Sequence, residues 1–237
     1  MPKKKILFTA FLAYSSYALA NADVEEGPNN IHVGPVWNYV TSNWGNGLEQ
    51  KGSLYGLLGS YSYIAEDTFY LNAEFMYTAG ILKGSAGNDP TQEYVTELRL
   101  GYTLSLAKAK FMLTPFTGIA SYLIHQSLSG HEDFNGNFWY VPVGLMGSYH
   151  LNSDWCLRFL GFGAPTFGGH YKEHDHSAHA STKPLWTAEL PVLYLGSLPF
   201  ELAIVPFVTG WGFHTSDTLT SQTNTYYGIR LDFGYQF

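Results

Sequence analysis

The sequence has 237 residues, of which 46% are hydrophobic, 17% aromatic and only 13% charged, and its formal net charge is -7 at pH 7. This negative charge argues against nucleic acid as a partner, because phosphate binding needs clustered cations. Beyond the first 20 residues no apolar run reaches the roughly 18 residues of a transmembrane helix, so none is expected. The 25 glycines and the many aromatic residues are instead typical of a chain built from strands.

The first 20 residues have the pattern of a secretory signal peptide. Lys3, Lys4 and Lys5 form a basic start, an uncharged and mostly apolar stretch extends to Leu19, and small residues flank Leu19. We expect cleavage after Ala20 and therefore export; an uncleaved N-terminal anchor is the alternative. In an oxidising compartment the single cysteine has no partner within the chain, and we interpret it as a small packed side chain.

After residues 21–30, which we interpret as a periplasmic lead, apolar and polar residues alternate in ten segments. Side chains of a strand alternate between its two faces, so each segment predicts a strand with one apolar face. In chain order the segments are about 31–40, 54–64, 69–79, 93–104, 110–123, 138–151, 155–163, 184–194, 200–213 and 226–237. The facing of 110–123 is ambiguous, because Phe111, Leu113 and Phe116 do not share a parity.

The last segment alternates most regularly. Its outward set is Tyr227, Ile229, Leu231, Phe233, Tyr235 and Phe237. This segment resembles the terminal strand of bacterial outer-membrane β-barrels. The resemblance implies that barrel-assembly machinery recognises the strand, with Tyr235 and Phe237 as the assembly signal.

The connections between segments alternate in length. Four are short, at 65–68, around 108, and at 152–154 and 196–199, whereas five are long and polar, at 41–53, 80–92, 124–137, 164–183 and 214–225. Long outer loops, short periplasmic turns and an even strand number are typical of outer-membrane barrels. The fold class predicted for 31–237 is therefore all-β, an antiparallel transmembrane β-barrel of ten strands in a Gram-negative outer membrane. Eight strands and a secreted soluble β-sandwich are the alternatives.

Five prolines fall inside the predicted strands, where proline cannot donate to a ladder. A closed barrel has no free edge, so we expect them at bulges or where a strand leaves the membrane. They are Pro35, Pro115, Pro142, Pro191 and Pro206.

Seven charged residues fall on the polar parity of their strands and should face the lumen. Because an isolated buried ion is costly, charges inside a narrow barrel must be paired or hydrated. We expect an ion network that plugs the lumen, with the polar lining of a small water channel as the alternative. The predicted network is Glu74, Glu97, Arg99, Arg158, Glu189, Arg230 and Asp232.

One short stretch is faintly similar to the His-x-Ser-Asn motif of the outer-membrane lipid A deacylases. His214, Ser216 and Asn224 match it, which would make His214 the base and Ser216 the nucleophile. Asp217 stands where asparagine is usual, and Gly228 occupies the place of the orienting glutamate. A triad without its orienting acid is much weaker, so no catalytic residue is assigned.

A histidine-rich tract is the remaining candidate site. His170, His174, His176 and His179 lie within ten residues, beside Glu173 and Asp175. Imidazole and carboxylate ligands suit zinc or nickel, so we expect weak metal binding there and no resident cofactor elsewhere. A solvated loop that binds metal only as an expression tag does is the alternative.

For the function as a whole we expect a non-catalytic barrel whose long outer loops contact an extracellular ligand, a host surface or a partner protein. Its lipid partner would be the outer membrane. The alternatives are a small porin-like channel and a deacylase-like hydrolase.

Overall fold

The computed structural model describes residues 28–44, 47, 49–84, 87–106, 110–127, 134–173, 176–195, 199–215 and 221–237, with the backbone alone for 171–181 and 215. The predicted signal peptide 1–20 and most of the lead 21–30 lie outside this range. The first strand begins at Asn29, inside the segment expected to be the lead.

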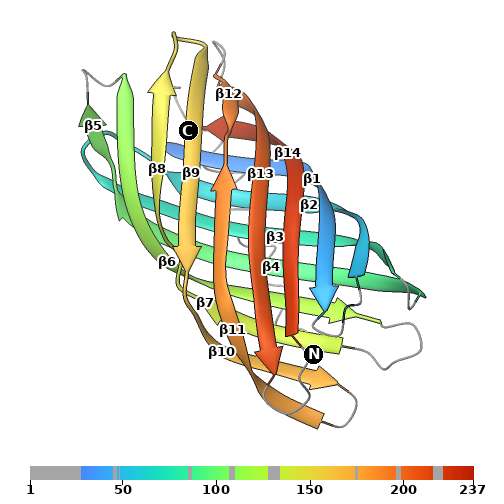
Figure 1. Cartoon of the computed structure of the whole chain (residues 1–237). Coiled ribbons are helices and arrows are strands. Elements are labelled where there is room, and N and C mark those ends of the chain that lie inside the picture. Colours follow the sequence, from blue (N-terminus) through green and yellow to red (C-terminus); the bar gives the residue numbers. More distant parts are fainter. Residues whose placement is uncertain are drawn as a thin grey trace, which may run out of the picture.

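The described residues form one closed antiparallel β-barrel (Figure 1). Closure is made by β14, which pairs with β1 along its length, from Asn30 opposite Gln236 to Trp44 opposite Gln222. No helix among the described residues could span a membrane. The strand segments are β1 (Asn29–Trp44), β2 (Glu49–Tyr63), β3 (Phe69–Gly84), β4 (Gly87–Tyr102), β5 (Leu104–Leu106), β6 (Phe111–Gln126), β7 (Phe134–Tyr140), β8 (Val143–His150), β9 (Trp155–Ala164), β10 (Thr166–Glu173), β11 (His176–Glu189), β12 (Val192–Tyr194), β13 (Phe200–Thr215) and β14 (Ser221–Gln236).

These segments make ten barrel strands, because β4 continues into β5, β7 into β8, β9 into β10 and β11 into β12. The all-β, ten-stranded prediction is confirmed, and the eight-stranded and β-sandwich alternatives are wrong. The strands could be identified from the sequence because apolar and polar residues alternate along them.

The outer surface is apolar over the middle of the strands. Leu57, Leu100 and Val143 are more than half exposed there, as expected for side chains that meet lipid. Two sets of exposed aromatic residues bound this band. One set includes Tyr39, Tyr55, Trp139, Trp186 and Tyr227, and the other includes Phe69, Tyr102, Tyr149, Trp155, Tyr194 and Phe200.

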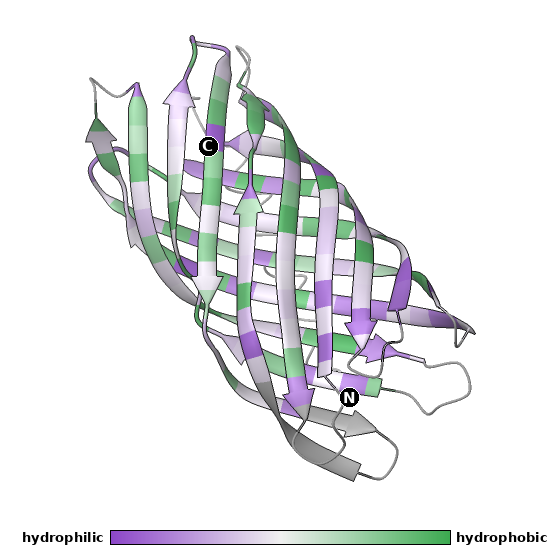
Figure 2. Ribbon diagram, in the orientation of Figure 1, coloured by the Kyte–Doolittle hydropathy of each residue, from purple (hydrophilic) through white to green (hydrophobic). Residues whose placement is uncertain are grey.

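Beyond the first set, the outward residues become polar. Figure 2 shows hydrophobic residues along the strands and hydrophilic residues at several of their lower and right-hand ends. Asn43, Lys51, Lys83 and Gln92 are exposed at the ends remote from Phe237. The aromatic and polar pattern therefore gives the barrel two different ends.

The long loops expected from the sequence are mostly strand. β3 continues to Gly84 and β4 begins at Gly87, so the region 80–92 is a hairpin with a short connection. The same holds for 164–183, which forms most of the β10–β11 hairpin. Outside the membrane the outward face no longer has to be apolar, so the alternation that marks a strand in the sequence disappears although the ladder continues.

Prolines interrupt some strands without shifting their register. β7 and β8 are separated around Pro142, yet both pair with β6 in one continuous register, Ala120 opposite Tyr140 and Thr117 opposite Val143. Pro191 separates β11 from β12 in the same manner. Pro35, Pro115 and Pro206 remain inside β1, β6 and β13. The expectation that all five lie at bulges or membrane exits is therefore wrong.

The ambiguous facing of 110–123 has a structural cause. In β6 Phe116 points inward and is 5% exposed, whereas Ile119 points outward and is 45% exposed. Both faces carry apolar residues because part of the barrel interior is itself an apolar core, formed by residues such as Tyr122, Ile124 and Phe138.

Candidate functional site

The interior of the barrel is the candidate site, and strand parity builds it. In β4 the inward residues follow at every second position, among them Glu93, Glu97 and Arg99, and β14 likewise directs Tyr226, Arg230 and Asp232 inward. Glu97 lies directly opposite Glu74 of β3 in the ladder. Two like charges in such a pair repel each other, so nearby cations are needed.

Arg230 provides the first cation and binds two acids. Its two terminal nitrogens donate to both carboxylate oxygens of Glu189 at 3.1 and 3.0 Å, and its Nε donates to Asp232 at 3.0 Å. Glu189 is on β11, and both β11 and β14 pair with β13, so this fork reaches over the inner face of β13 and joins two strands that are not adjacent. A bidentate guanidinium–carboxylate pair fixes geometry as well as charge.

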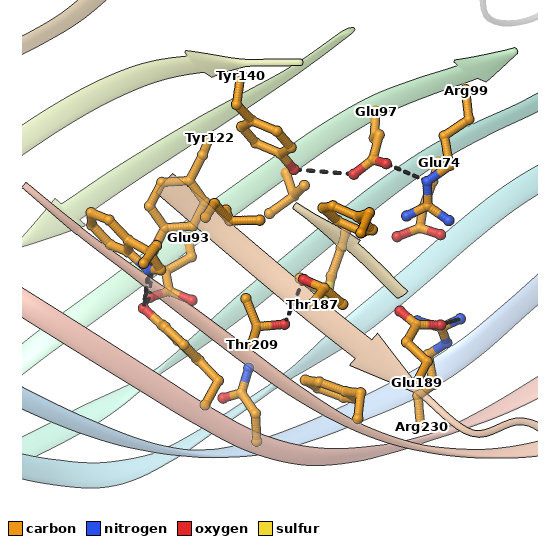
Figure 3. A pocket seen from close by; sticks show the side chains of 18 residues that line it. Glu74, Glu93, Glu97, Arg99, Tyr122, Tyr140, Thr187, Glu189, Thr209 and Arg230 are labelled. Atoms are coloured by element: carbon orange, nitrogen blue, oxygen red, sulfur yellow. Dashed lines mark hydrogen bonds and ion pairs between the residues drawn. The ribbon is translucent and has the colours of Figure 1, made fainter. Parts of the chain in front are cut away.

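Arg99 provides the second cation. Its Nε donates to Glu97, which also accepts a 3.1 Å hydrogen bond from the hydroxyl of Tyr140 (Figure 3). The guanidinium carbon lies 5.5 Å from the ring centroid of Phe116 and 5.3 Å from that of Phe162. Glu74 lies beside Arg99 in the same view. We call Glu74, Glu97, Arg99, Glu189, Arg230 and Asp232 the ionic layer.

The seventh residue of the predicted network lies apart from these contacts. Arg158 of β9 donates from Nε to the hydroxyl of Ser148 at 3.1 Å and makes no ion pair within the described part of the chain. Arg158 faces the part of the lumen nearer Phe237. A contact that the sequence analysis missed, between His32 of β1 and Glu201 of β13, lies in the same part. His32 and Glu201 lie in the predicted segments 31–40 and 200–213. Only the fact that both side chains fall on the inward face of their strands could have indicated that they meet.

A second buried carboxylate cluster was also missed. Glu93 accepts hydrogen bonds from Tyr226 at 2.7 Å, Tyr122 at 2.8 Å and Thr78 at 3.1 Å. The indole of Trp211 donates to the Tyr226 hydroxyl at 3.1 Å. Glu93 is the first residue of the predicted segment 93–104 and shares the parity of Glu97 and Arg99, so parity alone could have placed it in the lumen.

Aromatic side chains fill the lumen at the end remote from Phe237. The rings of Phe134 and Phe213 stack with centroids 5.3 Å apart, and Trp44 meets each of them edge-on at 6.3 Å. We call Trp44, Phe134 and Phe213 the aromatic plug. Trp44 and Phe134 lie in the segments predicted as loops, 41–53 and 124–137, and for this reason the sequence does not predict the plug.

Two small spaces lie inside the described barrel. We call the space between the aromatic plug and the ionic layer the upper cavity, and its volume is about 80 Å³. We call the space on the His32 side, nearer Phe237, the lower cavity, and its volume is about 60 Å³. Glu74, Arg99, Glu189 and Arg230 line both cavities. The ionic layer therefore lies between the two spaces.

The histidine tract lies on the β10–β11 hairpin at the lower end of Figure 1. The backbone register places His170 opposite His179 and Glu173 opposite His176. His174 lies outside the described residues. Among the described side chains, no group of three metal-binding residues is present, but the side chains of His176 and His179 are not among them.

The deacylase-like residues do not converge where they are described. His214 of β13 points outward, whereas Asn224 of β14 is inward and 2% exposed. Ser216 and Asp217 lie outside the described residues. The matching asparagine and histidine therefore lie on opposite faces of the barrel wall.

The predicted assembly signal lies at the seam of the barrel. The backbone nitrogen of Phe237 donates to Asn29 at 3.0 Å, and the Tyr235 ring lies 5.3 Å from that of Phe200 and 6.2 Å from that of Phe237. The aromatic end of β14 is thus part of the closure between the first and last strands.

Comparisons with known proteins identify the fold. No protein-family model matches the sequence, and no curated protein sequence matches it significantly. The structure is similar to that of the outer membrane protease OmpT from Escherichia coli, with a TM-score of 0.58, 10% identity, and 90% of this chain and 99% of that chain covered. It is also similar to the translocator domain of the autotransporter NalP from Neisseria meningitidis, with a TM-score of 0.50, 10% identity, and coverage of 99% and 98%. The chain has the β-barrel fold of these outer-membrane proteins.

Replacing Arg99 should destabilise the barrel strongly. Arg99→Met would leave Glu97 buried without its cation, and breaking a buried pair in this way costs about 3–5 kcal/mol of unfolding free energy. The matched control is Lys51→Met, which removes a cation from the exposed pair with Glu49 and should change stability by less than about 1 kcal/mol. Urea unfolding of both variants in lipid vesicles measures the difference, and equal effects would contradict the pairing of Arg99 in the lumen.

Proposed function

We propose that the protein is a non-conducting β-barrel of the Gram-negative outer membrane whose outer rim binds an extracellular ligand, a host surface or a partner protein. The observation that carries this proposal is the filled lumen. The aromatic plug, the Glu93 cluster and the ionic layer occupy successive levels, and they leave cavities of about 80 and 60 Å³. A conducting pore needs a continuous aqueous path.

The membrane location is supported by the outer surface. An apolar band between two sets of aromatic residues is what a bilayer requires of a barrel, and exposure of so many large apolar side chains would cause aggregation in water. The similarity in fold to known outer-membrane barrels supports the same location.

The outer rim supports the binding role. We define the outer rim as the exposed polar residues of the strands beyond the Tyr39–Tyr227 aromatic set. Strands that continue past the membrane present these residues on a hydrogen-bonded wall, and a rigid scaffold positions contact residues well. The rim includes Asn43, Glu49, Lys51, Lys83, Gln92, Asn135, Lys183 and His214.

The purified barrel should not conduct in planar bilayers. Arg230 and Arg99 hold the ionic layer across the lumen, so current steps should be absent at neutral pH. Stable, discrete single-channel steps from the folded protein would contradict the proposal and favour the porin-like channel.

Binding by the rim needs a separate measurement on cells that display the protein. We expect such cells to adhere to wells coated with extracellular-matrix protein, and adhesion to fall when Lys51, Lys83 and Lys183 are replaced by Ser. The control is Lys110→Ser, which removes an exposed cation outside the rim, just before the start of β6. Equal adhesion of all three strains would remove the support for a surface-binding role.

We further propose weak zinc or nickel binding at His170, His174, His176 and His179. The support is the backbone register, since residues directly opposite in an antiparallel pair have Cβ atoms about 4.5–5.5 Å apart, and His170 is opposite His179. Two imidazoles at this separation can share one metal ion, and the rest of the tract supplies further ligands.

Metal binding should depend on the tract and on pH. Replacing His174, His176 and His179 with Ala should abolish the heat of zinc or nickel binding in calorimetry at neutral pH. Lowering the pH below about 6 should do the same in the unmodified protein, because imidazole protonates and releases metal. The control replaces His125, His150 and His214, which lie outside the tract. Heats that are the same in both triple variants would exclude this site.

A further inference from the structure

The upper cavity has the walls of an aromatic cage. Tyr122, Tyr140, Trp211 and Tyr226 line it, and the rings of Tyr122 and Trp211 lie 4.8 Å apart at an angle of 59°. At this distance the two rings contact each other, so a guest in the cavity lies beside the pair and not between its rings, against the aromatic side chains that line the space. The faces of aromatic rings attract cations, most strongly where water is excluded.

A carboxylate without a cation partner faces this cage. Glu93 is 3% exposed, and within the described part of the chain it is held by hydroxyl groups alone, those of Tyr226, Tyr122 and Thr78. The hydroxyl groups position the carboxylate but do not neutralise it. A buried carboxylate is costly when no opposite charge is near.

The charge around the cavity is unbalanced as a whole. Its lining includes four carboxyl groups, those of Glu74, Glu93, Glu97 and Glu189, against the two guanidinium groups of Arg99 and Arg230. Both guanidinium groups are already bound to acids of the ionic layer. The cavity therefore favours a guest of positive charge and disfavours an anion.

An unused acceptor also lines the cavity. Asn38 of β1 is 1% exposed, and its Oδ1 has no hydrogen-bond partner among the residues that the structure describes. A buried acceptor without a donor is unfavourable by about 1–3 kcal/mol. Because Asn38 lines the same space as Glu93, a guest that donates an N–H to its side-chain oxygen would satisfy it.

From these observations we propose that the upper cavity binds a small alkylammonium ion. Its positive charge is matched by Glu93, its methyl groups by the aromatic walls, and its N–H by Asn38. A cavity of 150 Å³ holds benzene, so the volume of about 80 Å³ suits a guest of roughly three to five non-hydrogen atoms. The site is independent of the outer rim, so either proposal can fail without the other.

The test is equilibrium dialysis of the folded barrel in detergent against labelled dimethylammonium chloride, which allows for slow entry past the aromatic plug. We expect saturable binding of one ion per barrel that sodium chloride at the same ionic strength does not displace. Glu93→Gln should weaken binding by at least about tenfold, because a desolvated charge contact exceeds the 1.4 kcal/mol of a tenfold change. Glu49→Gln, which removes a carboxylate from the exposed rim, should leave binding unchanged.

Two further variants keep the test decisive. Asn38→Leu and Trp211→Leu each retain Glu93 and should each weaken binding, and heat-modifiable migration on gels verifies that every variant is folded. Absence of saturable binding by the unmodified protein would overturn the proposal. So would displacement by sodium, or equal binding by the Glu93 and Glu49 variants.

Discussion

A closed barrel in a membrane has to satisfy its inward charges within its own lumen. Within the apolar band the outward face of each strand is suited to lipid, so strand alternation directs most polar residues of the band into the narrow lumen. Arg230 illustrates the solution, since it binds Asp232 of its own strand β14 and Glu189 of β11 at once. The position of these charges along the strands then decides the level at which the ionic layer forms in the lumen.

The same constraint explains the division of the interior into levels. Where no cation is available, Glu93 is held by tyrosine and threonine hydroxyl groups, and the tyrosines in turn pack against Trp211. Nearer the outer rim Trp44, Phe134 and Phe213 fill the interior with rings, beside the buried amides of Gln50 and Gln126 and the buried carboxylate of Asp89. These side chains occupy successive levels of the interior, which supports the proposed non-conducting barrel.

The sequence predicts the outward face better than the inward one. Lipid requires apolar side chains at every second position, and this regularity revealed the ten strands and the parity of Glu97, Arg99 and Arg230. The inward face follows no such rule, because rings, hydroxyl groups and ion pairs can all fill a lumen. For this reason Tyr122 and Trp211 were not recognised as parts of a site, and His32 was not linked to Glu201. The strand ends were missed for the same reason, since polar residues outside the membrane look like a loop.

The account depends most directly on the pairing of Glu189 with Arg230 inside the lumen, and a double-mutant cycle measures it. The unfolding free energies of Glu189→Gln, Arg230→Met and the double variant are compared with that of the unmodified barrel in lipid vesicles. A buried, bidentate pair predicts that each single change is strongly destabilising and that the double change costs much less than their sum, with a coupling of about 2–3 kcal/mol. Single effects that simply add would contradict the account, because the two side chains would then not be neutralising each other in the lumen.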